Sequence, residues 1–92
     1  MQRFSYKLKT FIKAIEVIAN QKGLQLKIIT KKGSGIRFEL FRSNSSIPEN
    51  FWVVHTEHEA SKRITSKQDY KKAAYELNID VKDFIKILEE EK

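Results

Sequence analysis

Apolar residues recur at steps of three and four positions near the start of the chain. The repeat comprises Phe4, Leu8, Phe11, Ile12, Ile15 and Ala19. Such spacing places the side chains on one face of an α-helix. Gly23 follows the repeat, and glycine suits the left-handed conformation that ends many helices. We therefore predict a helix from about Ser5 to about Lys22.

The pattern then changes to alternation of apolar and polar residues, which is typical of strands with one buried face. Alternating residues occupy 24–29 and 36–41, on either side of a glycine-containing turn at 31–35, and predict a β-hairpin. A polar connection at 43–50 leads to a third predicted strand, 51–56, which is rich in aromatic and β-branched residues. Because short connections favour antiparallel neighbours, the expected topology is a meander.

Two further helices are predicted in the last third of the chain. The first has an apolar face made of Tyr70, Ala73, Ala74 and Leu77. A capping box can begin at Thr65 or at Ser66, and Asn78 can adopt the left-handed conformation that ends the helix. Asp80 is placed to cap the second helix. The apolar face of that helix consists of Val81, Phe84, Ile85 and Leu88.

The element order α-β-β-β-α-α predicts one α+β domain over residues 1–92, a length that suits a single domain. We expect helices on one face of a three-stranded antiparallel sheet. The other face is then left for function. This open face is expected to carry Lys27, Arg37, Glu39 and Phe41, together with every second residue of 51–56.

Cationic and aromatic groups on an open sheet face suit RNA, because cations neutralise phosphates and rings stack on bases. An alternative interpretation is structural. In it, Phe41 and Trp52 close a small auxiliary core against the N-terminus, and the face has no ligand. Both interpretations stay open from the sequence.

Charge changes the picture, because it is distributed unevenly. The formal net charge is +6 at pH 7. Residues 1–46 hold ten basic and two acidic residues, a net of +8, and residues 47–92 hold eight and ten, a net of −2. Within the second half, 60–72 has a net of +4 and 76–92 a net of −3. A basic domain points to a polyanion partner, most simply nucleic acid, although such lysines can also serve solubility alone.

Composition also excludes several classes of protein. The chain has no cysteine, which excludes a disulfide scaffold, a cysteine-ligated metal site and a thiol nucleophile. No apolar run approaches the ~20 residues of a membrane span, and the N-terminus lacks the pattern of a signal peptide. We therefore expect a cytoplasmic protein with no membrane partner, no cofactor and no small-molecule substrate.

The candidates for acid–base chemistry are His55 and His58. With Glu59 they could form a metal cluster, but their spacing is not a familiar zinc pattern, and we predict no metal. His55 is the better candidate for a general acid or base in phosphodiester cleavage, because a near-neutral pKa suits proton transfer. The alternative is a histidine at a strand end that only makes a structural hydrogen bond.

The turn at 31–35 is a second candidate site. Its glycines let the backbone approach a phosphate closely, Ser34 adds a hydroxyl, and the flanking lysines supply charge. It lacks the spacing and the strand-to-helix context of a Walker loop. The alternative is an ordinary glycine-rich hairpin tip.

In their order, these pieces resemble the HicA family, small RNA-cleaving toxins of toxin–antitoxin pairs with a fold like that of double-stranded-RNA-binding domains (dsRBD-like). Segment 32–38 matches the family's Gly-Ser-His turn and the strand after it, and 53–55 matches its apolar strand ending in histidine. A basic loop at 62–72, a helix at 70–77 and an apolar-containing ending at 78–85 follow in the family's order.

The likeness covers about 11–88, with one departure. The turn histidine of the family is its catalytic residue, and this chain has Gly35 there. The resemblance implies a metal-independent endoribonuclease in which the RNA 2′-hydroxyl attacks the adjacent phosphate. Gly35 cannot transfer a proton, so three interpretations stay open: a degenerate RNA-binding member, a member in which His55 has taken over, or an inactivated variant.

Two functions are therefore expected. The first is an RNA-binding protein resembling a HicA toxin, degenerate or weakly active in cleavage, with His55 as the catalytic candidate. Its expected nucleic-acid-binding residues are Lys31, Lys32, Gly33, Ser34, Gly35, Arg37, Lys62, Arg63, Lys67, Lys71 and Lys72. The alternative is a non-catalytic basic module that binds an acidic protein, either an antitoxin-like partner or an inhibited nucleic-acid enzyme. A nonspecific DNA-binding protein ranks third, because no helix-turn-helix pattern is present.

Overall fold

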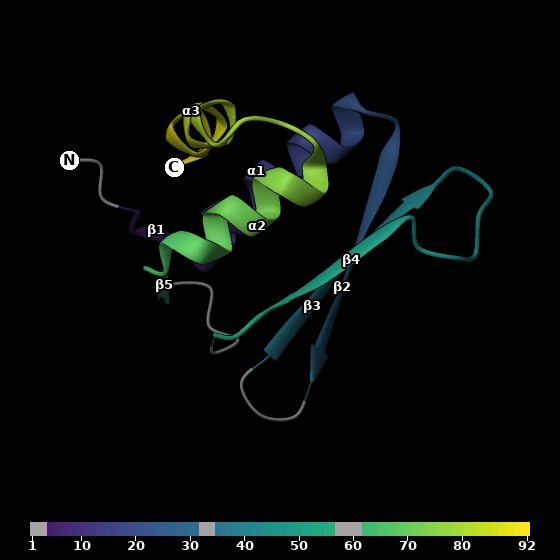
Figure 1. The fold of residues 1–92 in the computed structure, drawn as a ribbon, viewed down its shortest axis with the longest axis horizontal. Coiled ribbons are helices and arrows are strands. Elements are labelled where there is room, and N and C mark those ends of the chain that lie inside the picture. The colour runs from purple at the N-terminus through teal and green to yellow at the C-terminus, as the bar shows by residue number, and fades with distance from the viewer. Residues whose placement is uncertain (1–3, 32–34, 57–61) are drawn as a thin grey trace.

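The computed structural model describes residues 4–31, 35–56 and 62–92. These ranges hold three helices and five strands, arranged as drawn in Figure 1. The strands are β1 (Tyr6–Lys7), β2 (Leu24–Lys31), β3 (Gly35–Arg42), β4 (Asn50–Val54) and β5 (Arg63–Ile64). The helices are α1 (Leu8–Gln21), α2 (Lys67–Leu77) and α3 (Val81–Glu91). The predicted α+β class is confirmed.

The predicted three-stranded antiparallel sheet is also confirmed, with strand order β2-β3-β4. β2 and β3 form the expected hairpin, with Leu26 opposite Leu40 and Ile28 opposite Phe38. β3 and β4 pair next, with Phe38 opposite Trp52. Residues that lie opposite each other in an antiparallel pair share a face of the sheet, so this register decides which side chains meet.

The structure also contains a second, two-stranded sheet, which the sequence did not predict. β1 pairs with β5, with Tyr6 opposite Ile64 and Lys7 opposite Arg63. The residues before α1 are therefore extended, and α1 begins at Leu8 rather than near Ser5. Strands of two residues are too short to show an alternating pattern, which is why the sequence did not predict them.

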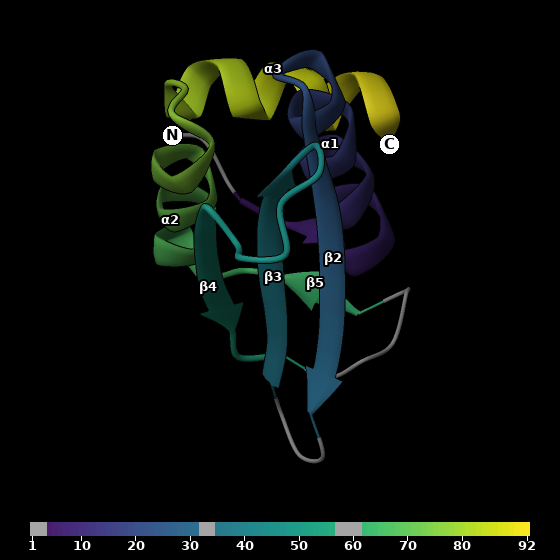
Figure 2. The same cartoon turned by 90° about the vertical axis from the view of Figure 1, so that its right-hand side faces the viewer.

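The two faces of the larger sheet differ in burial. One face carries Phe38 and Trp52, whose stacked rings have centroids 5.2 Å apart and which belong to the core shared with the helices. The other carries Lys27, Glu39 and Phe51 in one row across the three strands. Figure 2 shows β2, β3 and β4 in front, with α1 and α3 behind them.

An aromatic cluster joins the sheet to all three helices. The ring of Phe11 in α1 lies 5.9 Å from that of Phe38 in β3, 5.4 Å from that of Tyr70 in α2 and 5.6 Å from that of Phe84 in α3, between centroids. All four side chains are fully buried. Each edge-to-face pair contributes roughly 0.5–1.5 kcal/mol beyond the burial of its area.

The helix ends largely follow the predictions. Gly23 (φ 73°) and Asn78 (φ 58°) are both left-handed, as expected after α1 and α2. Ser66 and Asp80 are the N-cap residues of α2 and α3, but neither side chain makes a capping hydrogen bond. None of the helices in the described ranges is long and apolar enough to span a membrane.

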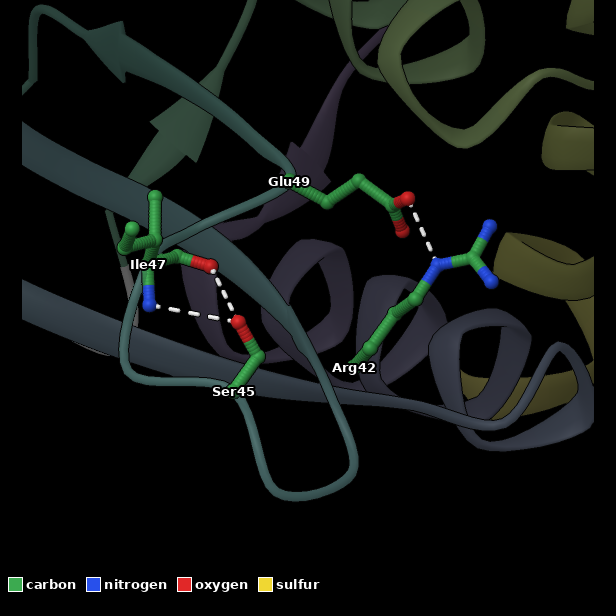
Figure 3. Close-up of polar contacts among 4 residues, drawn as sticks. All are labelled: Arg42, Ser45, Ile47 and Glu49. Carbon is green, nitrogen blue, oxygen red and sulfur yellow. Dashed lines mark hydrogen bonds and ion pairs between the residues drawn. The ribbon is translucent and has the colours of Figure 1, made fainter.

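The connection between β3 and β4 is held by its own polar contacts (Figure 3). Ser45 Oγ donates to the carbonyl of Ile47 (3.0 Å) and accepts from its amide (3.3 Å), which closes a local turn. Arg42 Nε lies 2.6 Å from Glu49 Oε1, and the Glu49 amide donates to the Leu40 carbonyl (2.7 Å). These contacts fix where β4 starts and thus its register with β3.

Tyr70 provides a test of how the small sheet is attached. Its hydroxyl donates to the carbonyl of Ile64 and accepts from the amide of Tyr6 (3.0 Å). Tyr70→Phe leaves both backbone groups without this partner, and we expect a loss of about 1–3 kcal/mol in the free energy of unfolding, measured in urea. Tyr75→Phe is the control, because Tyr75 is 76% exposed, and it should change stability by less than about 0.5 kcal/mol. Equal effects of the two variants would contradict this assignment.

Candidate nucleic-acid interface

Several predicted site residues come together at one end of the larger sheet. Gly35 begins β3 and pairs with Lys31 of β2, while Ile36 pairs with Val54, the last residue of β4. His55 follows Val54 directly and therefore lies at the same end of the sheet as Gly35. The other members of the predicted phosphate turn lie outside the described residues; they are Lys32, Gly33 and Ser34.

His55 lies beyond β4 and not within it, so the prediction of a strand through residue 56 was wrong. His55 is exposed. Its charge lowers the pKa of Asp69 in the first turn of α2, while burial, the larger effect, raises that pKa above its ordinary value. His55 is thus close enough to α2 to interact with its first turn. Figures 1 and 2 both show the end of β4 beside the start of α2.

The basic segment, residues 62–72, places its cations over β5 and the first turns of α2. Its five basic residues are all exposed: Lys62, Arg63, Lys67, Lys71 and Lys72. Contacts tie this segment to the chain's beginning. The Lys62 carbonyl accepts from the Leu8 amide (2.7 Å), and Arg63 Nη1 donates to the Ser5 carbonyl (2.6 Å).

The cations of α2 differ in how far their charge is compensated. Lys72 Nζ lies 2.9 Å from Glu76 Oε2, which neutralises it locally. Lys67 and Lys71 make no ion pair with any residue in the described ranges. The N-cap Ser66 gives the first turn no side-chain hydrogen bond, so the positive end of the helix dipole adds to these two charges, and Asp69 in the same turn offsets part of the sum. An anion is favoured there.

Arg37 is in a different situation. Its Nε lies 2.9 Å from Glu39 Oε2, and its guanidinium carbon lies 4.2 Å from the centroid of the Phe51 ring. Glu39 is only 8% exposed, although it lies on the open face of the sheet. Arg37 is therefore held in place by an internal carboxylate, and its charge is largely compensated.

The register places Lys27, Arg37, Glu39 and Phe41 on one face of the sheet, as the alternation predicts. The residues of β4 on the same face are Phe51 and Val53. The alternative of an auxiliary core is wrong. Trp52 lies on the opposite face, buried in the main core against Phe38, so it cannot meet Phe41.

Sequence reasoning missed two features of these surfaces. Asp69 is not among the predicted site residues, and its position near His55 depends on packing that a pattern does not show. The pairing of Arg37 with Glu39 had a usable signal, because residues two apart in a strand share a face. No cluster of three or more metal-ligating side chains is found in the part of the chain that the structure describes, a part that leaves out His58 and Glu59.

Comparison with protein-family models, curated proteins and solved structures finds no match for the chain. The resemblance to HicA toxins therefore stays a prediction from the order of its motifs. What the described residues establish is the geometry itself: a sheet end with Gly35 and His55, and beside it a helix start with uncompensated cations.

The interaction of His55 with Asp69 can be tested by titration. A carboxyl group titrates at acid pH, where an imidazole carries its proton, so removing the imidazole removes a favourable charge near the Asp69 carboxylate. We expect His55→Ala to raise the pKa of Asp69 further, measured from its carboxyl carbon shift by NMR. The control variant is Tyr75→Ala, a change at an exposed residue further along α2, which should leave the pKa of Asp69 as it is. An unchanged Asp69 titration would show that His55 does not face α2.

Proposed function

We propose that this protein binds RNA through the basic segment and the adjoining end of the sheet, with a dsRBD-like architecture like that of HicA toxins. The order α1-β2-β3-β4-α2, with α1 packed on β2 and α2 on β4, supports the architecture. The observation that carries the proposal is that Lys67 and Lys71, two exposed cations in the first turns of α2, make no ion pair with any described residue, at a helix start whose N-cap side chain makes no hydrogen bond. A cytoplasmic location belongs to the same proposal.

Phosphate neutralisation explains why this surface suits a polyanion. Each Lys or Arg that contacts a phosphate releases condensed counterions, and this release drives most nonspecific binding. Lys67 and Lys71 have no ion pair in the described ranges to give up for a phosphate, although Lys67 lies 5.9 Å from the centroid of the Phe4 ring, whereas Arg37 must give up or share Glu39. The RNA contacts are therefore assigned first to α2 and Arg63, and only weakly to Arg37.

Cleavage activity is proposed to be weak. The position that matches the family's catalytic histidine is Gly35, which supplies no proton-transfer group. His55 lies at the same end of the sheet and is the one imidazole within the described ranges. It would have to serve both as base toward the 2′-hydroxyl and as acid toward the leaving oxygen. Losing a general acid or base costs typically 10²–10⁴-fold in rate.

Salt dependence tests the RNA surface. We expect affinity for a labelled RNA, measured by fluorescence anisotropy between about 50 and 200 mM salt, to fall steeply as salt rises. Lys67→Ala with Lys71→Ala removes two phosphate contacts, so the slope of log affinity against log salt should shrink by about 1.4–1.8.

The matched control is Lys82→Ala with Lys86→Ala, two exposed lysines of α3 with the same total charge change. This control should leave the slope nearly unchanged. If both double variants lose affinity equally, the effect is one of net charge alone and the α2 surface is not the site. Absence of RNA binding at low salt would refute the proposed function.

Restoring the missing imidazole tests the link to RNA cleavage. A Cβ on Gly35 would lie 3.7 Å from Val53 Cγ1, an ordinary contact, and Gly35 does not have a positive φ. Gly35→His should therefore fold and should raise the rate of cleavage of a labelled RNA by about 10²–10⁴-fold. Gly35→Ala, which adds the Cβ without the imidazole, should give no gain. A folded Gly35→His variant that binds RNA and does not cleave it would show that Gly35 is not at the catalytic position.

A further inference from the structure

The open face of the larger sheet carries more apolar surface than the helix-packed fold requires. Phe51 is 54% exposed and Val53 is 37% exposed, and both point to this face. Ile29 and Phe41, on the same face, are half-buried. Phe51 and Val53 are neighbours along β4, and Phe41 lies diagonally across from Phe51 on β3, so these three form an apolar patch. Ile29 lies on the far side of Arg37, in the same row as Val53. Contiguous patches of this kind on a small protein commonly mark an interaction site.

Cations border the patch. Lys27 is exposed and lies in the same row as Glu39 and Phe51. Arg37 lies in the next row, opposite Ile29 and Val53. The one acid on this face, Glu39, is buried and paired with Arg37, so it presents little charge to a ligand. The Arg37–Glu39 pair carries no net charge, so the excess positive charge beside the patch comes from the exposed Lys27.

Arg37 is set up to hold an acidic group. Its Nε is bonded to Glu39 and its guanidinium plane is supported by the Phe51 ring, which fixes the side chain before any ligand arrives. The outer edge of the guanidinium, with both Nη atoms, makes no hydrogen bond with any residue in the described ranges. A planar, preorganised guanidinium binds a carboxylate in a bidentate manner and loses little side-chain entropy in doing so.

We infer that this face, hereafter the sheet-face patch, is a docking surface for an acidic polypeptide that presents apolar side chains between its carboxylates. Phe51 and Val53 would contact its apolar side chains, and Arg37 and Lys27 its carboxylates. Aromatic and arginine side chains are the residue types that dominate binding energy at protein interfaces. The inference concerns a surface distinct from the α2 surface that is proposed for RNA, and neither depends on the other.

Charge and shape favour this occupant over two others. A second copy of the chain would bring its own Lys27 to a face whose excess charge is also that of Lys27, and it would offer no exposed carboxylate to the outer edge of Arg37. RNA would stack bases on Phe51, but the Arg37 guanidinium already lies over that ring, and Ile29 and Val53 offer no flat surface for stacking. An acidic polypeptide with apolar side chains matches both the sign and the apolar character of the patch.

The test uses a synthetic seven-residue peptide of alternating glutamate and apolar residues as the probe. It is titrated into isotope-labelled full-length protein and followed by amide NMR shifts. We expect saturable shifts confined to 25–29, 37–41 and 51–53. The same peptide with lysine in place of glutamate should give none, because its charges repel Lys27 and Arg37.

Matched variants locate the contact. Phe51→Ser should weaken peptide binding by about tenfold, the effect of losing one interface anchor. Tyr75→Ser, which removes an exposed aromatic on α2, should leave peptide binding unchanged. Lys27→Glu should also weaken binding, whereas Lys82→Glu, with the same charge change on α3, should not. Because Phe51, Tyr75 and both lysines are exposed, all four variants are expected to fold.

Three results would overturn the inference. The first is no saturable shift on the sheet-face patch with the acidic peptide, or equal binding of the lysine peptide. The second is a short oligonucleotide that shifts the same amides, which would make the patch an RNA surface. The third is concentration-dependent self-association that buries the patch, which would make a second copy its occupant. RNA binding through Lys67 and Lys71 would survive the first and third results, so the failure of each proposal can be distinguished.

Discussion

The contact of one buried ring with three others holds this fold together. Phe11 of α1 meets Phe38 of the sheet, Tyr70 of α2 and Phe84 of α3, so a single side chain fixes the position of every large element. The consequence for function runs through Tyr70. Tyr70, Ala73, Ala74 and Leu77 form the buried face of α2. This leaves Lys71 on the exposed side of the helix, and Lys67 is exposed at its first residue. The proposed RNA surface is thus a result of core packing.

The register of the larger sheet determines the second surface. Alternation sends Phe38 and Trp52 into the core and leaves Arg37, Phe51 and Val53 on the other face. On that face Glu39 is buried beneath its partner, because Arg37 and the neighbouring strands cover it. A buried carboxylate is stable only when it is paired. Glu39 therefore depends on Arg37 for its charge, and Arg37 depends on Glu39 for its orientation.

The sequence was sufficient for the elements that bury a periodic apolar face. The spacing of Phe11 and Ile15 and the alternation of Ile36, Phe38 and Leu40 predicted α1 and the hairpin, because burial of one face is what those periods report. The two-residue strands β1 and β5 were not predictable, since their pairing depends on Tyr70 bonding the backbone of Tyr6 and Ile64. Ion pairs also depend on how side chains are packed and oriented. The cations of 62–72 could therefore be predicted from the sequence, but not which of them have acidic partners.

Compensation of charge, rather than net charge, separates the two surfaces. Formal charge counts Arg37, Lys67 and Lys71 alike, and on that count each is an equal candidate for a phosphate. The structure gives Arg37 an ion pair with an internal carboxylate and an aromatic support. Lys67 and Lys71 make no ion pair with any residue in the described ranges, although Asp69 lies in the same helical turn and Lys67 lies over the Phe4 ring. A polyanion gains most where it neutralises charges that nothing else neutralises, which is the start of α2. At the sheet-face patch the gain from charge is smaller, so a ligand there needs apolar contact as well, and a polypeptide can supply both.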